Sequence, residues 1–260
     1  MKIAVFDTNL TDAQWNLIRT MLPKPSTFGR PPTDRRRVLD AIFYMVKGGI
    51  PWRLLPSCFP PWKTVFHIFR QWQTTKLWGY LNDRLRAHIR EAAGRKAQPT
   101  AAIIDSQSVK SAAHGGTVGY DAGKRIKGRK RHLLVDSMGL LLGVVVTPAS
   151  MPEREGGKTL LGRVLHGFTS LRRLWADGGY AGSDFAQSAR EMSPKLEVEI
   201  IKRSDDTSGF KVLPKRWVVE RTFGWIMQHR RLARDYERTE SSAEAWVYLA
   251  MIRIQLRRLA

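Results

Sequence analysis

Three acidic residues stand far apart in this chain, at positions where a strand or helix pattern begins or ends. Asp105 closes the apolar run AAIID, Asp177 closes LWAD and is followed by Gly178 and Gly179, and Glu220 lies in the helical segment KRWVVERTFGW. Metal-dependent phosphoryl transfer on a nucleic-acid backbone needs two or three carboxylates from different elements around a pair of divalent ions about 3.5 to 4 Å apart. The three acids have the type and placement that such metal ligands require.

Each acid also has a plainer interpretation. Asp-Gly-Gly after a strand is a common turn sequence, because Asp bonds its own backbone and glycine tolerates unusual dihedral angles. Glu220 follows Arg216 by one helical turn and adjoins Arg221, so a plain surface ion pair is the alternative for it. Asp136 ends LLVD, but a Gly-containing turn follows and favours turn chemistry. The choice depends on what the rest of the chain places beside these acids.

The charge of the chain is its most unusual property. Its 260 residues include 44 Lys and Arg against 23 Asp and Glu, a formal net charge of +21 at pH 7. Such an excess predicts a polyanionic partner, most commonly nucleic acid, with a membrane surface as the alternative. No apolar run approaches the roughly 18 residues that span a bilayer, and the short apolar start is interrupted at Asp7, which does not fit a secretion signal. We therefore expect a cytoplasmic protein with no membrane partner.

Metal ligands other than oxygen are scarce in the sequence. Cys58 is the only cysteine, which excludes an internal disulfide and a cysteine zinc cluster. His114 and His132 have no partner at metal-binding spacing. A metal ion here would need oxygen ligands or histidines.

Residues 1 to 95 are predicted to form a helical domain. LTDAQWNLIRTMLP opens with Thr11 and Gln14 at the spacing of a capping box, and Thr33 or Asp34 caps a second helix that ends at Gly48. PPWKTVFHIFRQWQ and LWGYLNDRLRAHIREAAG predict two more helices. Short helices with exposed arginines are typical of a helix-turn-helix DNA-binding domain, and a generic helical bundle is the alternative.

The pattern changes after RKAQPT, so a second domain is predicted for residues 96 to 260. Strands are expected at 101 to 105, 131 to 137, 139 to 147, 171 to 177 and 196 to 202, the second and third forming a hairpin. Helices are expected at 156 to 167, at 215 to 233 and at the end of the chain. This order predicts an α/β fold with a mixed sheet.

Basic residues gather in several short stretches. Six of the eight residues from 124 to 131 are Lys or Arg, and seven more lie between 215 and 238. A solvated charge run is the usual interpretation, but beside acids that bind metal, phosphate contact is favoured, and we predict that residues 115 to 129 form a mobile loop facing DNA. The predicted DNA contacts are Arg35, Arg36, Arg37, Lys124, Arg125, Lys127, Arg129, Lys130, Arg131, Arg221, Arg230 and Arg231.

The segments around the three acids resemble a known family. AAIIDSQSVK, WADGGYAG and WVVERTFGWIMQHRRLARDYE are similar to the segments that carry the first Asp, the second Asp and the Glu in DDE transposases of bacterial insertion sequences, of the insertion sequence five family. GRPPTD, GIPWRLLP and KGRKRHLLVD extend the resemblance over nearly the whole chain, and VERTFGW with WADGGYAG is a specific combination. The resemblance implies an RNase H-like mixed sheet flanked by helices after the helical N-terminal domain.

The resemblance also implies roles for particular residues. Asp105, Asp177 and Glu220 match the ligands of two Mg²⁺ ions, for which Mn²⁺ substitutes, and Arg216 matches an arginine that orients the Glu or a scissile phosphate. Two positions depart from the family signature. Leu213 stands where a tyrosine is expected and Met227 where a lysine is expected; Arg230 or Arg231 offers the missing charge, and we interpret both changes as subgroup variation.

The function implied by the resemblance is transposition. Such an enzyme binds the terminal inverted repeats of its own element in double-stranded DNA, cleaves the ends and joins the freed 3′ hydroxyls to target DNA. A homodimer or larger assembly on DNA, associated with the bacterial nucleoid, is implied in the same way. A stand-alone RNase H-like nuclease and a purely DNA-binding regulator are the two alternatives.

Overall fold

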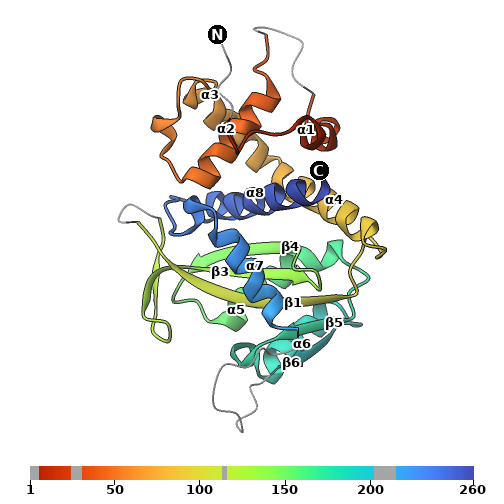
Figure 1. The fold of residues 1–260 in the computed structure, drawn as a ribbon. Helices are drawn as coiled ribbons and strands as arrows, with labels where there is room; N and C mark the ends of the chain where they lie inside the picture. Colours follow the sequence, from red (N-terminus) through yellow and green to blue (C-terminus); the bar gives the residue numbers. More distant parts are fainter. Residues whose placement is uncertain (1–5, 25–30, 113–115, 202–214) are drawn as a thin grey trace.

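The computed structural model describes residues 6–24, 31–112, 116–201 and 215–260. A mixed β-sheet carries helices on both faces, and the N-terminal helices pack beyond the long C-terminal helix (Figure 1). This is the α/β arrangement with a helical N-terminal region that the sequence predicts, and it is consistent with an RNase H-like domain.

The N-terminal helices begin and end where the sequence signals them. They are α1 (Asp12–Ile18), α2 (Arg35–Gly48), α3 (Trp62–Thr74) and α4 (Leu77–Ala92). Thr11 and Gln14 form the expected capping box, and the side chain of Asp34 caps α2 by accepting a hydrogen bond from the backbone N–H of Arg36 at 2.8 Å. α2 ends at Gly48 and is capped by Gly49, whose φ of 73° lies in the left-handed region that glycine adopts easily. The four helices expected between residues 10 and 94 are confirmed.

The described strands form one sheet. They are β1 (Ala101–Lys110), β2 (Gly119–Asp121), β3 (Ile126–Asp136), β4 (Leu141–Pro148), β5 (Arg173–Ala176) and β6 (Glu197–Ile200). The sheet order is β2-β3-β1-β5-β6, with β4 also paired to β3. β3 is antiparallel to β1 and to β4, whereas β5 runs parallel to β1 and β6 parallel to β5. The predicted hairpin and the mixed sheet are both confirmed.

Two local predictions are wrong. Residues 119 to 121 and 126 to 129 are not loop: they belong to β2 and β3, because their backbone groups pair with each other and with β1. The helix expected from 215 to 233 is shorter. α7 (Trp217–Met227) ends ten residues after it begins, and a separate 3₁₀ turn, η5 (Arg230–Leu232), follows it.

Apolar side chains alternate between the two faces of the sheet, as a period of two requires. On β1, Ile103 belongs to the core shared with α7 and α8 (Glu240–Leu259), and its neighbours Ala102 and Ile104 face the core under α5 (Glu153–Val164) and α6 (Ser183–Met192). Figure 1 shows α7 and α8 against the sheet, with β1 passing behind α7. The strand expected at 101 to 105 is longer than predicted: β1 continues to Lys110, so Asp105 lies midway along it, whereas Asp177 directly follows β5.

α8 joins the N-terminal helices to the sheet. Its Trp246 is fully buried and stacks on Phe69 of α3 with ring centroids 4.9 Å apart. The ring centroid of Trp52 lies 5.6 Å from that of Trp246. One continuous apolar core runs from α2 and α3 through α8 to β3 and β4. The domain boundary between residues 95 and 96 stays a prediction, and the packing across it is extensive.

The outer edge of β4 is covered by helix side chains. Asn82 Nδ2 of α4 donates to the carbonyl of Leu141 at 2.9 Å, and Glu244 Oε1 of α8 accepts from the N–H of Val146 at 3.1 Å. These bonds occupy backbone groups that would otherwise be open to another strand. Among the helices of the described ranges, none has both the length and the apolar character of a membrane span.

Candidate active site

The pairing register of β1 and β5 brings two of the predicted acids together. Ala101 pairs with Arg173 and Ile103 with Trp175, one residue for one residue. Continuing this register by two residues places Asp105 level with Asp177 and, because side chains alternate along a strand, on the same face of the sheet. Each carboxylate also accepts a local backbone bond, Asp105 from Ser106 N–H at 2.7 Å and Asp177 from Gly179 N–H at 2.9 Å. The Asp-Gly-Gly sequence therefore forms a turn, and its first residue, Asp177, also lies beside Asp105.

Arg216 connects the second acid to the third. Its Nη2 lies 3.5 Å from Asp177 Oδ2 and 3.5 Å from Glu220 Oε1. Glu220 is in the first turn of α7, one helical turn after Arg216, so the sequence spacing sets one of these contacts and the tertiary fold sets the other. Arg216 is mostly buried, whereas Glu220 is exposed. The arginine thus holds acids from β5 and α7 in one cluster.

The electrostatics of Asp105 are unfavourable for a bare carboxylate. Burial, and then the nearby charge of Asp177, raise the pKa of Asp105 to about 7; the Ser106 N–H, Arg216 and Lys124 act in the opposite direction. Two carboxylates in a poorly solvated place resist being ionised together. A divalent cation bound between them would remove this repulsion.

The donor atoms suit a hard divalent cation such as Mg²⁺, which prefers carboxylate oxygens. Asp105 and Asp177 lie level on adjacent strands, and burial together with the charge of Asp177 raises the pKa of Asp105, so a cation bound between the two carboxylates would be favoured. Within the described part of the chain, no three or more His, Cys, Asp and Glu side chains are grouped closely enough to enclose a metal ion. Arg216 stands between Asp177 and Glu220 in this arrangement.

A fourth acid, Glu153, was not among the sequence predictions. Its Oε1 accepts hydrogen bonds from Ser106 Oγ and from Lys124 Nζ, both at 2.8 Å. Lys124 also donates to the carbonyl of Ser106 at 3.2 Å. A Cβ on Gly179, the second glycine after Asp177, would lie 2.0 Å from Glu153 Oε2, so a side chain there would displace this carboxylate. A signal was present, since Glu153 is the first residue of α5 and comes shortly after the end of β4 at Pro148.

Four of the predicted DNA contacts are buried. Arg129 pairs with Asp235 at 3.2 Å, Lys130 donates to the carbonyl of Met151 at 2.9 Å, and Arg131 donates to that of Leu232 at 2.7 Å. Arg231 pairs with Glu237 at 2.7 Å, donates to the carbonyl of Ile50 at 2.7 Å and lies over the Trp246 ring. β3 lies between β1 and β4, so cations on it are enclosed and bond to the protein. This placement goes against DNA contact by Arg129, Lys130, Arg131 and Arg231.

The other basic positions lie at the surface or partly below it. Lys124, Arg125, Lys127 and Arg230 are exposed. Arg35, Arg36 and Arg37 are half-buried with internal partners: the Trp72 ring, Asp12 at 2.6 Å and the Cys58 carbonyl, respectively. Arg221 lies between Trp217 and Trp225, with its Cζ 4.3 and 4.4 Å from the two ring centroids.

Several other sequence predictions have clear outcomes. Asp136 is fully buried, pairs with Arg90 at 2.6 Å and accepts from the N–H groups of Met138 and Leu140, which confirms turn chemistry. His132 is buried against Thr147. Met227 Sδ lies 3.8 Å from Arg131 Nη1, so the position of the expected lysine adjoins a buried cation. Leu213 and His114 lie outside the described residues.

Comparison with known proteins finds similarity over most of the chain. Residues 96–254 match the family described as "Transposase DDE domain", and residues 10–82 match "Putative transposase of IS4/5 family". Over 117 residues, 42% of this chain and 78% of the relative, it is 30% identical to "Insertion element IS402 uncharacterized 16.2 kDa protein" of Burkholderia cepacia. Over 118 residues it is 30% identical to "Putative transposase for insertion sequence element IS402" of the same organism, covering 43% of this chain and 54% of that protein.

Proposed function

This chain belongs to the transposase DDE domain family, of the type found in IS4/5 insertion elements, and we propose on that basis that it binds its element's terminal inverted repeats, cleaves the ends and joins the 3′ hydroxyls to target DNA. The observations that support the proposal are two pairwise arrangements. The register of β1 and β5 aligns Asp105 with Asp177, and Arg216 lies 3.5 Å from Asp177 and 3.5 Å from Glu220.

In the proposed mechanism, Asp105, Asp177 and Glu220 would hold two Mg²⁺ ions, for which Mn²⁺ would substitute. Such ions, when bound, would supply the Lewis-acid chemistry for in-line displacement at phosphorus by a water or a 3′ hydroxyl. The paired carboxylates of Asp105 and Asp177 supply negative charge that is incompletely balanced within the protein. Arg216 orients Glu220, or contacts the scissile phosphate once metal ligation occupies the acids.

Lys124 and Glu153 are proposed to position DNA at this centre. Glu153 holds the Lys124 ammonium beside the backbone of Ser106, the residue that follows Asp105. Lys124 remains partly exposed, so one side of its ammonium is open to a phosphate oxygen. Arg125, Lys127 and Arg230 provide further exposed charge for the DNA backbone. A homodimer or larger assembly on DNA, in the bacterial cytoplasm at the nucleoid, completes the proposal.

Purified full-length protein with labelled duplexes that carry the element ends tests this function. With Mg²⁺ and a target plasmid, we expect 3′ hydroxyls at the element ends and their covalent joining to the target, with both products lost in EDTA. Cleavage of any duplex without joining would favour a stand-alone nuclease. Selective binding without metal-dependent nicking would favour a DNA-binding regulator.

A further inference from the structure

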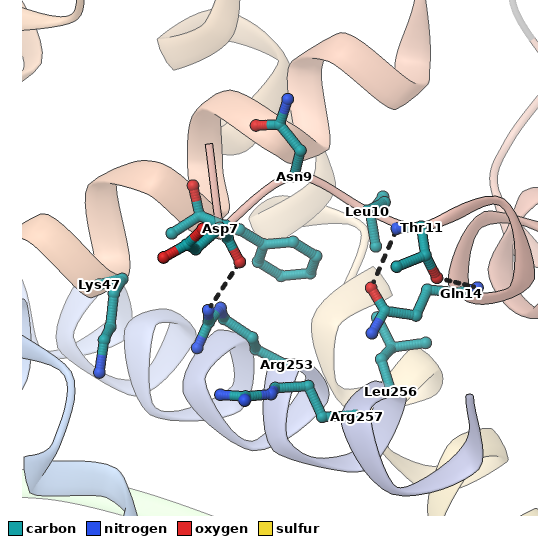
Figure 2. Close-up of a pocket in the computed structure, with 11 residues that line it drawn as sticks. Asp7, Asn9, Leu10, Thr11, Gln14, Lys47, Arg253, Leu256 and Arg257 are labelled. Atoms are coloured by element: carbon teal, nitrogen blue, oxygen red, sulfur yellow. Dashed lines mark hydrogen bonds between the residues drawn. The ribbon is translucent and has the colours of Figure 1, made fainter. Parts of the chain in front are cut away.

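A second charged site lies apart from the acid cluster, where the segment before α1 meets α2 and α8. It is a pocket of about 380 Å³ lined by residues 7 to 11 and by side chains of the three helices. Its basic residues are Lys47 of α2 and Arg253 and Arg257 of α8. Figure 2 shows these three side chains on one side of the pocket, with Asp7 and Thr11 on the chain segment across from them.

The pocket holds more positive charge than its acid can balance. Arg253 is buried with 8% of its surface exposed, and its only close partner among the described residues is the backbone carbonyl of Asp7 at 3.5 Å. Lys47 donates to the carbonyl of Gln228 at 3.0 Å. The described ion pairs include none of these three cations, and Asp7 is the one acid in the lining. The lining therefore has two uncompensated positive charges.

The cations also perturb one another. Burial, and then the charges of Arg253, Arg257 and Arg230, lower the pKa of Lys47. Burial and then Arg257 lower the pKa of Arg253, which Asp7 raises in part. Mutual repulsion of this kind is costly inside a protein and is relieved when an anion binds. Arg129 of β3 differs from these cations, because it pairs with the carboxylate of Asp235 at 3.2 Å.

A row of stacked side chains runs from Arg216 along α7 to α8. Trp217 follows Arg216, and the Cζ of Arg221 lies 4.3 Å from the Trp217 ring centroid and 4.4 Å from that of Trp225. Arg258 of α8 lies over the same Trp225 ring with its Cζ 4.3 Å from the centroid. The eight helical steps from 217 to 225 span about 12 Å. The row therefore reaches α8 at the residue next to Arg257 in the sequence.

We propose that this pocket binds a phosphate group of the duplex DNA backbone, several base pairs from the cleaved bond. Arg253 and Arg257 supply charge-assisted hydrogen bonds, and Lys47 supplies a third positive charge. Thr8 Oγ1, a buried atom without a hydrogen-bond partner, lines the same pocket and adds a donor. The proposal rests on the proposed function, since it names a further contact for the same DNA. Free inorganic phosphate has the same chemistry and is the alternative source.

The DNA arm of the test uses full-length Arg257→Gln and Lys47→Gln proteins, with Arg190→Gln as a control that makes the same charge change on α6, on the other face of the sheet. Loss of one phosphate contact makes the slope of log K against log salt shallower by about 0.9. We expect that change in both pocket variants and none in the control. Phosphate-ethylation interference should lose the same single position in both pocket variants, while cleavage by the bound complex stays at the wild-type rate.

The phosphate arm measures thermal stabilisation by inorganic phosphate. If the wild type and the pocket variants have the same salt slope and the same interference pattern, the inference is overturned. The proposed function then stands as long as the wild-type protein cleaves element ends. Wild-type protein that neither binds nor cleaves DNA, yet is stabilised by phosphate through Arg257, would overturn both the DNA assignment and the proposed function. Stabilisation by phosphate that competes with duplex binding would support the DNA assignment.

Discussion

Charged side chains are taken out of water in two parts of this molecule, with opposite outcomes. Around β3, buried charges have partners within the protein: Asp136 pairs with Arg90 at 2.6 Å, and Arg129 with Asp235 at 3.2 Å. Where β5 ends beside β1, Asp105 instead lies near Asp177, which carries the same charge, and burial together with that charge raises the pKa of Asp105 to about 7. The first arrangement stabilises a fold, and the second leaves charge for a ligand to neutralise.

The contrast teaches which charges to connect with function. A run of six cations in eight residues looks like a DNA-binding surface in the sequence, yet Arg129, Lys130 and Arg131 of that run are buried and bond inward. The pocket with Lys47, Arg253 and Arg257 draws on residues about 200 positions apart in the sequence, so no dense run of charge marks it, and its charges are poorly compensated. Compensation by neighbours, more than the density of charge along the chain, separates the structural cations from the functional ones.

The largest effect is expected from the acids. Asp105→Asn, Asp177→Asn and Glu220→Gln should each reduce cleavage and joining to background, because a shared metal cage loses its charge, while duplex binding is retained. Labelled-end cleavage at saturating Mg²⁺ measures this. Joining that persists in one variant would remove that residue from the site.

Asp105→Asn also has a signed stability effect. The pKa of Asp105 is raised on folding, so the unfolded chain releases this proton more readily, and its contribution to stability is lost as pH rises from about 4 through 7. Without divalent metal at pH 8, Asp105→Asn should therefore unfold at a temperature equal to or above that of the wild type. A clear drop in unfolding temperature would mean that the acid is structural.

The paired charges should show the reverse behaviour. Asp136→Asn leaves Arg90 buried without its carboxylate, and breaking such a pair costs about 3 to 5 kcal/mol of unfolding free energy. Denaturant unfolding measures the loss. The control is Asp12→Asn, which removes the partner of Arg36 at an exposed site and should change stability little. Equal unfolding free energies for Asp136→Asn and Asp12→Asn would mean that the buried pair stabilises the fold no more than the exposed pair does.

A smaller effect on activity is expected from Glu153. Glu153→Gln removes the charge that holds Lys124, and loss of such a supporting partner typically reduces activity about 10- to 100-fold. Lys124→Gln should have a similar effect, and the double variant should be no worse than either, because the two residues act as one unit. Glu155→Gln, an exposed change on the same helix, is the control. Activity losses that add up in the double variant would contradict joint action of Glu153 and Lys124. A higher Mg²⁺ requirement in Glu153→Gln alone would do the same.

The smallest effect concerns the basic run itself. Neutralising the exposed Arg125 and Lys127 together should make the slope of log K against log salt shallower by up to about 1.8, at 0.9 for each phosphate contact. Arg129→Met and Arg131→Met should leave the slope unchanged and lower the unfolding temperature, because their partners are internal. A slope that responds to the buried pair and not to the exposed pair would reverse the assignment.

The sequence by itself determined the local features of this protein. The capping box at Thr11, the cap at Asp34 and the hairpin turn after Asp136 each depend on residues within four positions of one another, so short-range hydrogen bonding decides them. Period-two and helical patterns were sufficient for the α/β class. The apolar runs AAIID and LWAD also marked Asp105 and Asp177, although only Asp177 follows the end of its strand and β1 continues past Asp105 to Lys110.

Tertiary structure decided everything that depends on distant neighbours. The parallel register that aligns Asp105 with Asp177 is set 72 residues apart, and Glu153 meets Lys124 only because α5 packs against β1 and β3. The burial of Arg129 to Arg131 follows from the place of β3 between two other strands, which no local pattern of charges encodes. Burial and pairing arise from contacts that the whole fold creates, and these determine whether a charged side chain is neutralised inside the protein or left to bind a ligand.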